Sequence, residues 1–113
     1  MTPEEIVVLS AKSAGIELEF QNGAAGRRVM VGNQQIWTPW EPHDNPADAM
    51  HLLVKHQMQI NSGIVSCYLG SSTTRIERAY PLTDKYDTAI DQATRVLCMA
   101  IAELAADIGR MMP

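Results

Sequence analysis

The sequence is poor in aromatic residues and has no long apolar run, and both shortages limit what the chain can be. Aromatic residues make up 5% of the 113 residues and apolar residues 46%, so the core has to be built from aliphatic and methionine side chains. No run approaches the roughly 18 apolar residues of a membrane helix, and the acidic start MTPEEIVVLS is unlike a signal peptide. We therefore expect a globular protein of the cytoplasm, with no membrane partner.

Basic residues and cysteines are also scarce. Nine Lys and Arg stand against 13 Asp and Glu, which leaves a net charge of -4. Nonspecific nucleic-acid binding needs clustered Lys and Arg to displace counterions, so we expect none here. Cys67 and Cys98 lie in apolar stretches without the spacing of a metal site. We expect buried free thiols, typical of a reducing compartment, and a disulfide between them is the less favoured alternative.

The strongest pattern that is present lies near the C-terminus, from Ala89 to Met111. Apolar residues recur there at spacings of three and four, which predicts one long amphipathic helix. Between Val96 and Ala106 the single charged residue is Glu103, so more than one face of this helix has to be hidden from water. We therefore expect the chain to form a homo-oligomer through the C-terminal helix, in addition to packing the helix on a sheet.

Both ends of this long helix carry residues that suit helix termini. Thr83 or Asp84 can cap its start, where Asp87 and Asp91 place negative charge near the positive end of the helix dipole. Gly109 and Pro113 are expected to close it.

Two further helices begin with similar signals. Thr2-Pro3-Glu4-Glu5 offers an N-cap, a proline in the first turn and a glutamate that can close a capping box, and Gly15 can end this helix. Asn45-Pro46-Ala47-Asp48 repeats the pattern for a helix that ends near Gln57. Its predicted buried residues are Ala49, Met50, Leu53 and Val54.

Alternating apolar and polar residues predict short strands between and after these helices. We expect strands at 16–20, 27–31, 34–38, 64–69 and 73–80, with turns at Gly32-Asn33 and Gly70-Ser71-Ser72. Both faces of 64–69 are largely apolar, which indicates a central strand. The chain, 1–113, is therefore expected to be a single α+β domain, in which an antiparallel sheet of four to five strands packs against three helices.

Signals for catalysis are weak throughout. The chain has no nucleophile elbow, no phosphate loop between a strand and a helix, and no paired-histidine motif. We therefore expect a protein that is not an enzyme, with no catalytic residue, cofactor or metal. A metal-dependent hydrolase built on His43, Asp48 and His51 is the alternative.

Indoles and guanidinium groups form the candidate ligand site. An indole offers a flat face to a base and a guanidinium offers a fork to a phosphate, which together can hold a small nucleotide. If the hairpin places Arg28 opposite Trp37, the guanidinium can lie over the indole. In the structural alternative, Trp40 staples the following helix to the core and the arginines are solvated. The candidate ligand-binding residues are Trp37, Trp40, Arg75, Arg78 and Arg28.

Two stretches resemble a known group of proteins. Trp40-x-Pro42, Asn45-Pro46-Ala47-Asp48-Ala49 and Leu52-Leu53-Val54-Lys55, followed by Ala100-Ile101-x-x-Leu104-Ala105-Ala106-x-Ile108-Gly109, resemble small proteins of tailed phages and prophages in the NinX-like neighbourhood. The resemblance implies a non-enzymatic accessory protein, made in the cytoplasm of a bacterial host cell, that counters host defence. It implies two modes of action, which are sequestering a small cyclic nucleotide signal and docking on a host defence protein as an inhibitor or adaptor.

Overall fold

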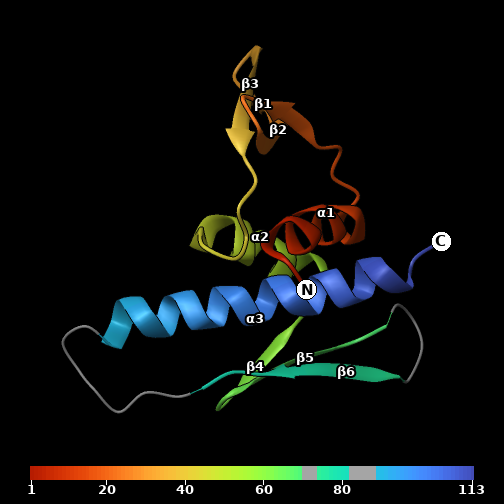
Figure 1. Ribbon diagram of the computed structural model, residues 1–113, viewed down its shortest axis with the longest axis vertical. Helices are drawn as coiled ribbons and strands as arrows, with labels where there is room; N and C mark the ends of the chain where they lie inside the picture. The colour runs from red at the N-terminus through yellow and green to blue at the C-terminus, as the bar shows by residue number, and fades with distance from the viewer. Residues whose placement is uncertain (70–73, 82–88) are drawn as a thin grey trace.

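Three helices and two three-stranded sheets make up the computed structural model, which describes residues 1–69, 74–81 and 89–113, with side chains of the last range from residue 93 onward. The helices form the middle layer, with one sheet above and one below (Figure 1). The α+β class and the long C-terminal helix are confirmed. The elements are α1 (Pro3–Ala14), β1 (Glu19–Gln21), β2 (Ala24–Val31), β3 (Gln34–Pro39), α2 (Pro46–Lys55), β4 (Gln59–Asn61), β5 (Ile64–Tyr68), β6 (Arg75–Ala79) and α3 (Ala89–Met111).

Both short helices begin as the sequence predicts. The Thr2 hydroxyl oxygen accepts a hydrogen bond from the Glu5 backbone N–H at 3.2 Å, and the Glu5 carboxylate accepts one from the Thr2 N–H at 3.4 Å. This reciprocal pair is a capping box. Gly15 follows α1 in the left-handed conformation, and the Asn45 side chain caps α2 by accepting a hydrogen bond from the Ala47 N–H at 2.9 Å.

The buried face of α2 differs from the predicted one. Met50 and Val54 are exposed, so their predicted burial was wrong, whereas Leu52 is fully buried. The physical reason lies with Asp48, whose burial is compensated by the hydrogen bond that its carboxylate accepts from the Glu41 N–H at 2.9 Å. Asp48 and Leu52 lie on the side of α2 that faces the core. A pattern of apolar residues cannot predict this side, because it counts a carboxylate as exposed.

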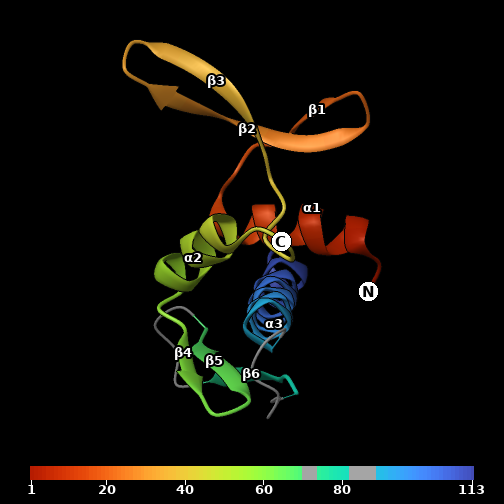
Figure 2. The same cartoon turned by 90° about the vertical axis from the view of Figure 1, so that its left-hand side faces the viewer.

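The strands β1, β2 and β3 form an antiparallel sheet that projects away from the helices (Figure 2). The predicted register of the β2–β3 hairpin is confirmed, with Arg28 opposite Trp37 and Val29 opposite Ile36. The predicted strand at 16–20 pairs only from Glu19 onward. Ile16 and Leu18 instead pack against the core, so this segment connects α1 to the sheet.

The second sheet has the order β4-β5-β6, so β5 is the central strand, as predicted. The side chains of Val65, Ser66 and Cys67 are buried there. The sequence analysis missed β4, because Gln59-Ile60-Asn61 is too polar and too short to stand out. The helical layer separates the two sheets, so the single sheet of four to five strands was wrong. The predicted turn at Gly70-Ser71-Ser72, the caps Thr83 and Asp84, and the side chains of Asp87 and Asp91 lie outside the described residues.

The long helix α3 lies between α1 and α2 on one side and the β4–β6 sheet on the other (Figure 1). Ala102, Leu104 and Ala106 are fully buried within the chain, whereas Val96 and Met99 are half-buried. The chain itself therefore covers the second half of α3, and a homo-oligomer through this helix stays a prediction for its first half. No helix among the described residues is long and apolar enough to cross a membrane.

The predicted bounds of α3 are confirmed, but Gly109 lies inside the helix and does not close it, and of the two predicted closing residues only Pro113 lies beyond its end. The position of Gly109 is set by tertiary packing. A Cβ atom on Gly109 would overlap the backbone carbonyl oxygen of Leu9 in α1. Only a residue without a side chain lets the two helix backbones approach this closely.

The substitution Gly109→Ala tests this packing by the sign of its effect. In an exposed helix the change stabilises by about 1 kcal/mol, but here we expect the free energy of unfolding to fall by about 1–3 kcal/mol because α1 has to shift. Urea unfolding followed by circular dichroism measures it. Arg110→Ala, at the exposed neighbouring position, is the control, and a Gly109→Ala protein as stable as the wild type would contradict the interpretation.

Candidate functional site

Trp40 lies at the junction between the projecting sheet and the helices and is fully buried. Its indole N–H donates a hydrogen bond to the Ser10 hydroxyl oxygen at 3.2 Å. The ring meets the His51 ring edge-on, with centroids 5.8 Å apart, and the Arg27 guanidinium carbon lies 4.9 Å from the indole centroid. The structure thus places Trp40 in the core, where it has no free face for a ligand.

Asp48 lies beside Trp40 and uses both carboxylate oxygens. One accepts the hydrogen bond from Glu41, and the other lies 3.7 Å from an Arg27 terminal nitrogen. His51 faces the indole, and burial lowers the pKa of its imidazole. Across the part of the chain that the structure describes, no three His, Cys, Asp or Glu side chains are grouped to hold a metal ion. The hydrolase alternative therefore gains no support from this geometry.

Arg28 and Trp37 lie opposite each other in the projecting sheet, but the guanidinium binds Glu19. The distances are 2.7 Å from Nε to one carboxylate oxygen and 2.8 Å from Nη2 to the other. The hydrogen bond from Arg28 holds the pKa of Glu19 below its ordinary value. The Trp37 indole N–H donates to the Glu19 backbone carbonyl at 2.9 Å. Among the described residues, the guanidinium that stacks on an indole is that of Arg27, which lies over Trp40.

Arg75 and Arg78 lie on β6, on the other side of the helical layer (Figure 1). Arg78 binds Asp107 of α3 through two hydrogen bonds, of 2.8 and 2.9 Å, and Glu103 through one of 3.2 Å. The hydrogen bonding to Asp107 is the main cause that raises the pKa of Arg78, and the negative charges of Asp107 and Glu103 raise it further. Arg75 donates to the Ser66 hydroxyl at 2.9 Å. The structure therefore does not bring the five candidate residues into one site, and each of them is engaged within the chain.

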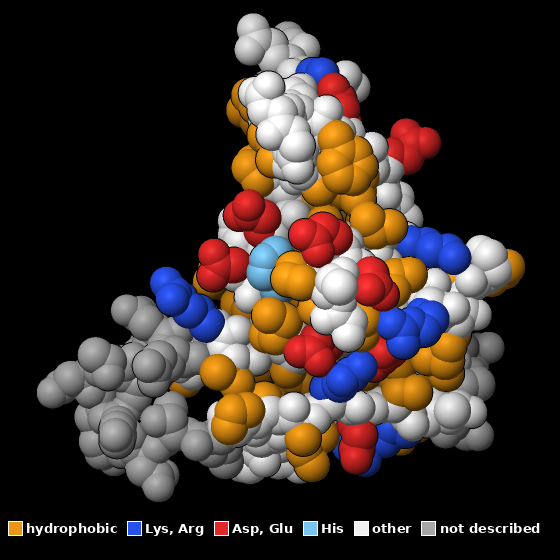
Figure 3. All heavy atoms as spheres, in the orientation of Figure 1, with side chains coloured by type: hydrophobic (Ala, Val, Ile, Leu, Met, Phe, Trp, Pro, Cys, Tyr) orange, Lys and Arg blue, Asp and Glu red, His pale blue; other side chains and the backbone are white. Residues whose placement is uncertain are grey.

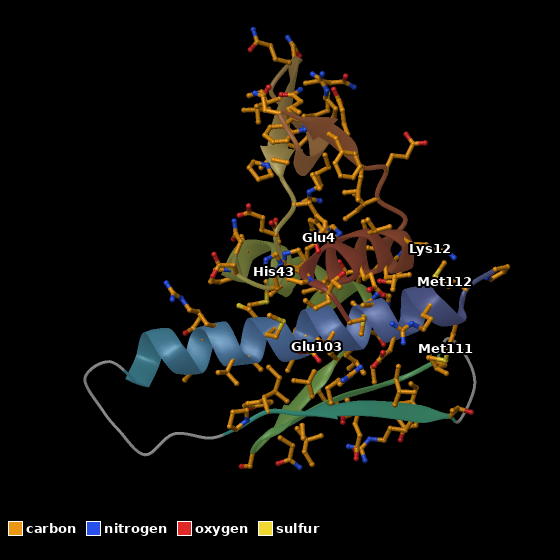
Figure 4. All side chains as sticks on the ribbon, in the orientation of Figure 1. Glu4, Lys12, His43, Glu103, Met111 and Met112 are labelled. Atoms are coloured by element: carbon orange, nitrogen blue, oxygen red, sulfur yellow. The ribbon has the colours of Figure 1, made fainter. Side chains whose placement is uncertain are left out.

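A groove of about 470 Å³ lies beside the first half of α3. Its apolar wall includes Val96 and Met99 of α3 and Tyr80, which follows β6. Charged and polar side chains surround it, among them His43 and Glu103, which Figure 4 labels on the chain ahead of α2 and on α3. Among the described residues, the lining consists of His43, Asp44, Ala79, Tyr80, Pro81, Arg95, Val96, Met99, Ala100 and Glu103.

Two details of this groove bear on its chemistry. The Nδ1 atom of His43 is buried and has no hydrogen-bond partner among the described residues. Arg95 is exposed over 76% of its side chain, and its Nε lies 3.9 Å from an Asp44 carboxylate oxygen. Sequence analysis did not single out the groove, because segments far apart in the chain form it. Its one signal was the surplus of apolar residues around Val96 and Met99.

The fold defines the class of the protein, which is a small α+β domain with a helical layer between two three-stranded antiparallel sheets, counted over the described residues. Comparison of the chain with protein-family models, with curated proteins and with solved structures found no match.

His56 gives the structure a testable pH dependence. Its Nε2 atom lies 3.0 Å from the Ser13 hydroxyl oxygen, so it joins the end of α2 to α1. Burial is the main cause that lowers the pKa of His56, and the nearby charge of Lys55 lowers it further. The unfolded chain therefore binds a proton at a higher pH than the folded chain does.

Because the folded pKa is depressed, the stabilisation is complete above the unfolded pKa of about 6.5 and is lost as the pH falls toward the folded value. We expect the free energy of unfolding to decrease between about pH 7.5 and 5.5, and to decrease less in His56→Gln, which keeps a polar partner for Ser13 but does not titrate. Urea unfolding at both pH values measures the difference. Identical pH dependence in both proteins would contradict it.

The ion pairs of Arg78 predict a structural role that variants can separate from ligand binding. Replacing Arg78 by Met leaves Asp107 and Glu103 close together without their cation, so we expect a loss of about 1 kcal/mol, kept modest by partial exposure. Arg75→Met is the matched control on the same strand and should cost less, because Arg75 lacks a two-pronged carboxylate partner. Equal losses in thermal or urea unfolding would refute the distinction.

Proposed function

We propose that the protein is a non-enzymatic phage or prophage accessory protein that docks on a host defence protein through the groove beside α3. The setting comes from the resemblance to small phage proteins. The mode of action is supported by one observation, which is that the groove combines half-buried apolar side chains, Val96 and Met99, with a charged rim. Such a combination suits an apolar anchor from a protein partner, held in a desolvated pocket with polar contacts around it.

Charge favours a protein over a nucleotide as the occupant. Counted over the described residues, the rim carries two carboxylates, Asp44 and Glu103, and one arginine, Arg95, and the whole chain carries a net charge of -4. Glu103 is bonded to Arg78, and Asp44 lies 3.9 Å from Arg95. A phosphate group entering this groove would therefore have to compete with a carboxylate for the arginine, whereas an uncharged, apolar side chain would not.

Sequestering a small cyclic nucleotide is the second candidate function. The observation in its favour is the exposed guanidinium of Arg95 beside an apolar wall that includes Tyr80. A base on the wall and a phosphate on the guanidinium would fit this arrangement. Trp37, Arg28, Arg75 and Arg78 stay candidates only if a ligand displaces their present partners.

Capture from a lysate of the bacterial host tests the docking mode. We expect the wild-type protein to retain one partner in stoichiometric amount and Met99→Glu to lose it by about tenfold or more, because a charge would replace an apolar contact at the centre of the interface. Val54→Glu is the control, since Val54 is exposed on α2 and does not line the groove. Retention of the partner by Met99→Glu would refute docking through the groove.

Isothermal titration calorimetry with a panel of cyclic nucleotides tests the second candidate. Binding by the wild-type protein that Arg95→Ala weakens would favour nucleotide sequestration and would count against the docking mode. An absence of heat across the panel, with partner capture intact, leaves docking as the function.

A further inference from the structure

One face of the projecting sheet carries apolar side chains of which several are exposed. Residues that alternate along a strand share a face, and directly paired residues on neighbouring strands lie on the same face. Phe20 is opposite Ala25, and Val29 is opposite Ile36. We call this surface the Phe20 face, and its apolar members are Phe20, Ala25, Val29, Val31 and Ile36.

The exposure of this face is unusual for side chains of this kind. Phe20 is 61% exposed, Val31 57% and Ile36 43%. Figure 3 shows apolar side chains on the projecting sheet on the side in view. Aliphatic and aromatic side chains gathered on one side of a sheet are typical of a surface that packs against another layer.

The opposite face has a different character. It carries the bidentate pair of Arg28 and Glu19, the Trp37 indole that donates to the backbone, and Gln35. Its exposed apolar side chains are Met30, at 62%, Ala24 and Pro39. The Phe20 face therefore has the cluster of exposed branched and aromatic side chains, and the opposite face has the ion pair and the indole hydrogen bond.

The sheet makes only slender contact with the helices. The junction consists mainly of Trp40, with Arg27 stacked on it, and of a hydrogen bond from the Trp40 N–H to the Ala25 carbonyl at 3.0 Å. A three-stranded sheet gains independent stability by packing an apolar face on something else. A second copy of the same chain can pack on this apolar face, and it is present wherever the protein is made.

The distribution of charge also favours a second copy. Residues 29–39 contain no charged side chain, and the one charged group on the Phe20 face, Arg27, is paired with Asp48. Figure 3 shows the acidic side chains of the visible side gathered mostly over the helical layer. Two chains of net charge -4 can therefore meet at this face while most of their carboxylates stay apart.

We propose that the Phe20 face is the interface of a homodimer, in which the same face of a second copy packs on it about a two-fold axis. The apolar side chains of the Phe20 face in one copy then contact those of the Phe20 face in the other, as in the packing of two sheets face to face. The interface is distinct from the groove beside α3, so it adds to the proposed docking function without depending on it. It also differs from an oligomer built on the C-terminal helix.

Sedimentation equilibrium of four proteins tests this proposal. We expect the wild-type protein to be a dimer and Val31→Glu to raise the dimer dissociation constant at least about tenfold, because a carboxylate would be buried in the interface. Met30→Glu is the matched control, adjacent in sequence, equally exposed and on the opposite face, and should stay dimeric. Met99→Glu should also stay dimeric.

A second matched pair keeps the test sharp if Val31→Glu folds poorly by circular dichroism. Ile36→Glu changes the Phe20 face, and Gln35→Glu changes the opposite face. A wild-type monomer at about 100 µM, a range in which specific dimers are populated, would overturn the proposal. The proposal would also be overturned if the two variants of each pair, one on each face of the sheet, changed the dimer dissociation constant equally. A dimer that only Met99→Glu dissociates would overturn it as well and would place the contact on α3.

Discussion

The burial of α3 on two sides is the constraint on which the rest of the structure depends. Gly109 lets the backbone of α1 approach on one side, while β5 and β6 cover the other, and Ala102 and Ala105 are fully buried between them. A helix used in this way separates the strands of the chain into two sheets. The groove, the two arginines on β6 and the projecting hairpin all take their places from that separation.

The same layering explains why the aromatic and basic residues do not gather. Trp40 is buried at the junction below the projecting sheet, where it bonds to Ser10 and packs against His51 and Arg27. Arg78 is drawn to the acidic side of α3 on the far side of the helices. The indole of Trp40 and the guanidinium of Arg78, which the sequence suggests for one ligand site, thus have structural roles on opposite sides of the helical layer.

Local signals explain how much of this fold could be predicted. The capping box at Thr2 and the cap at Asn45 are contacts between near neighbours, so the residue types alone indicate them. The hairpin register follows from a two-residue turn, and the long helix from its periodicity. The candidate site could not be predicted in the same way, because Tyr80, His43 and Met99 meet only through the packing of α3 against β6 and the chain ahead of α2.

By itself the sequence determined the helices, the β2–β3 hairpin, the central strand β5 and the α+β class, since each is written in spacings of a few residues. Only the tertiary structure decided that the strands form two sheets, that Gly109 serves a helix contact and not a helix end, and that Asp48 is buried while Met50 and Val54 are exposed. The physical reason is that these outcomes depend on which backbone and which hydrogen-bond partner a distant segment brings near, and hydrophobic periodicity carries no information about that partner.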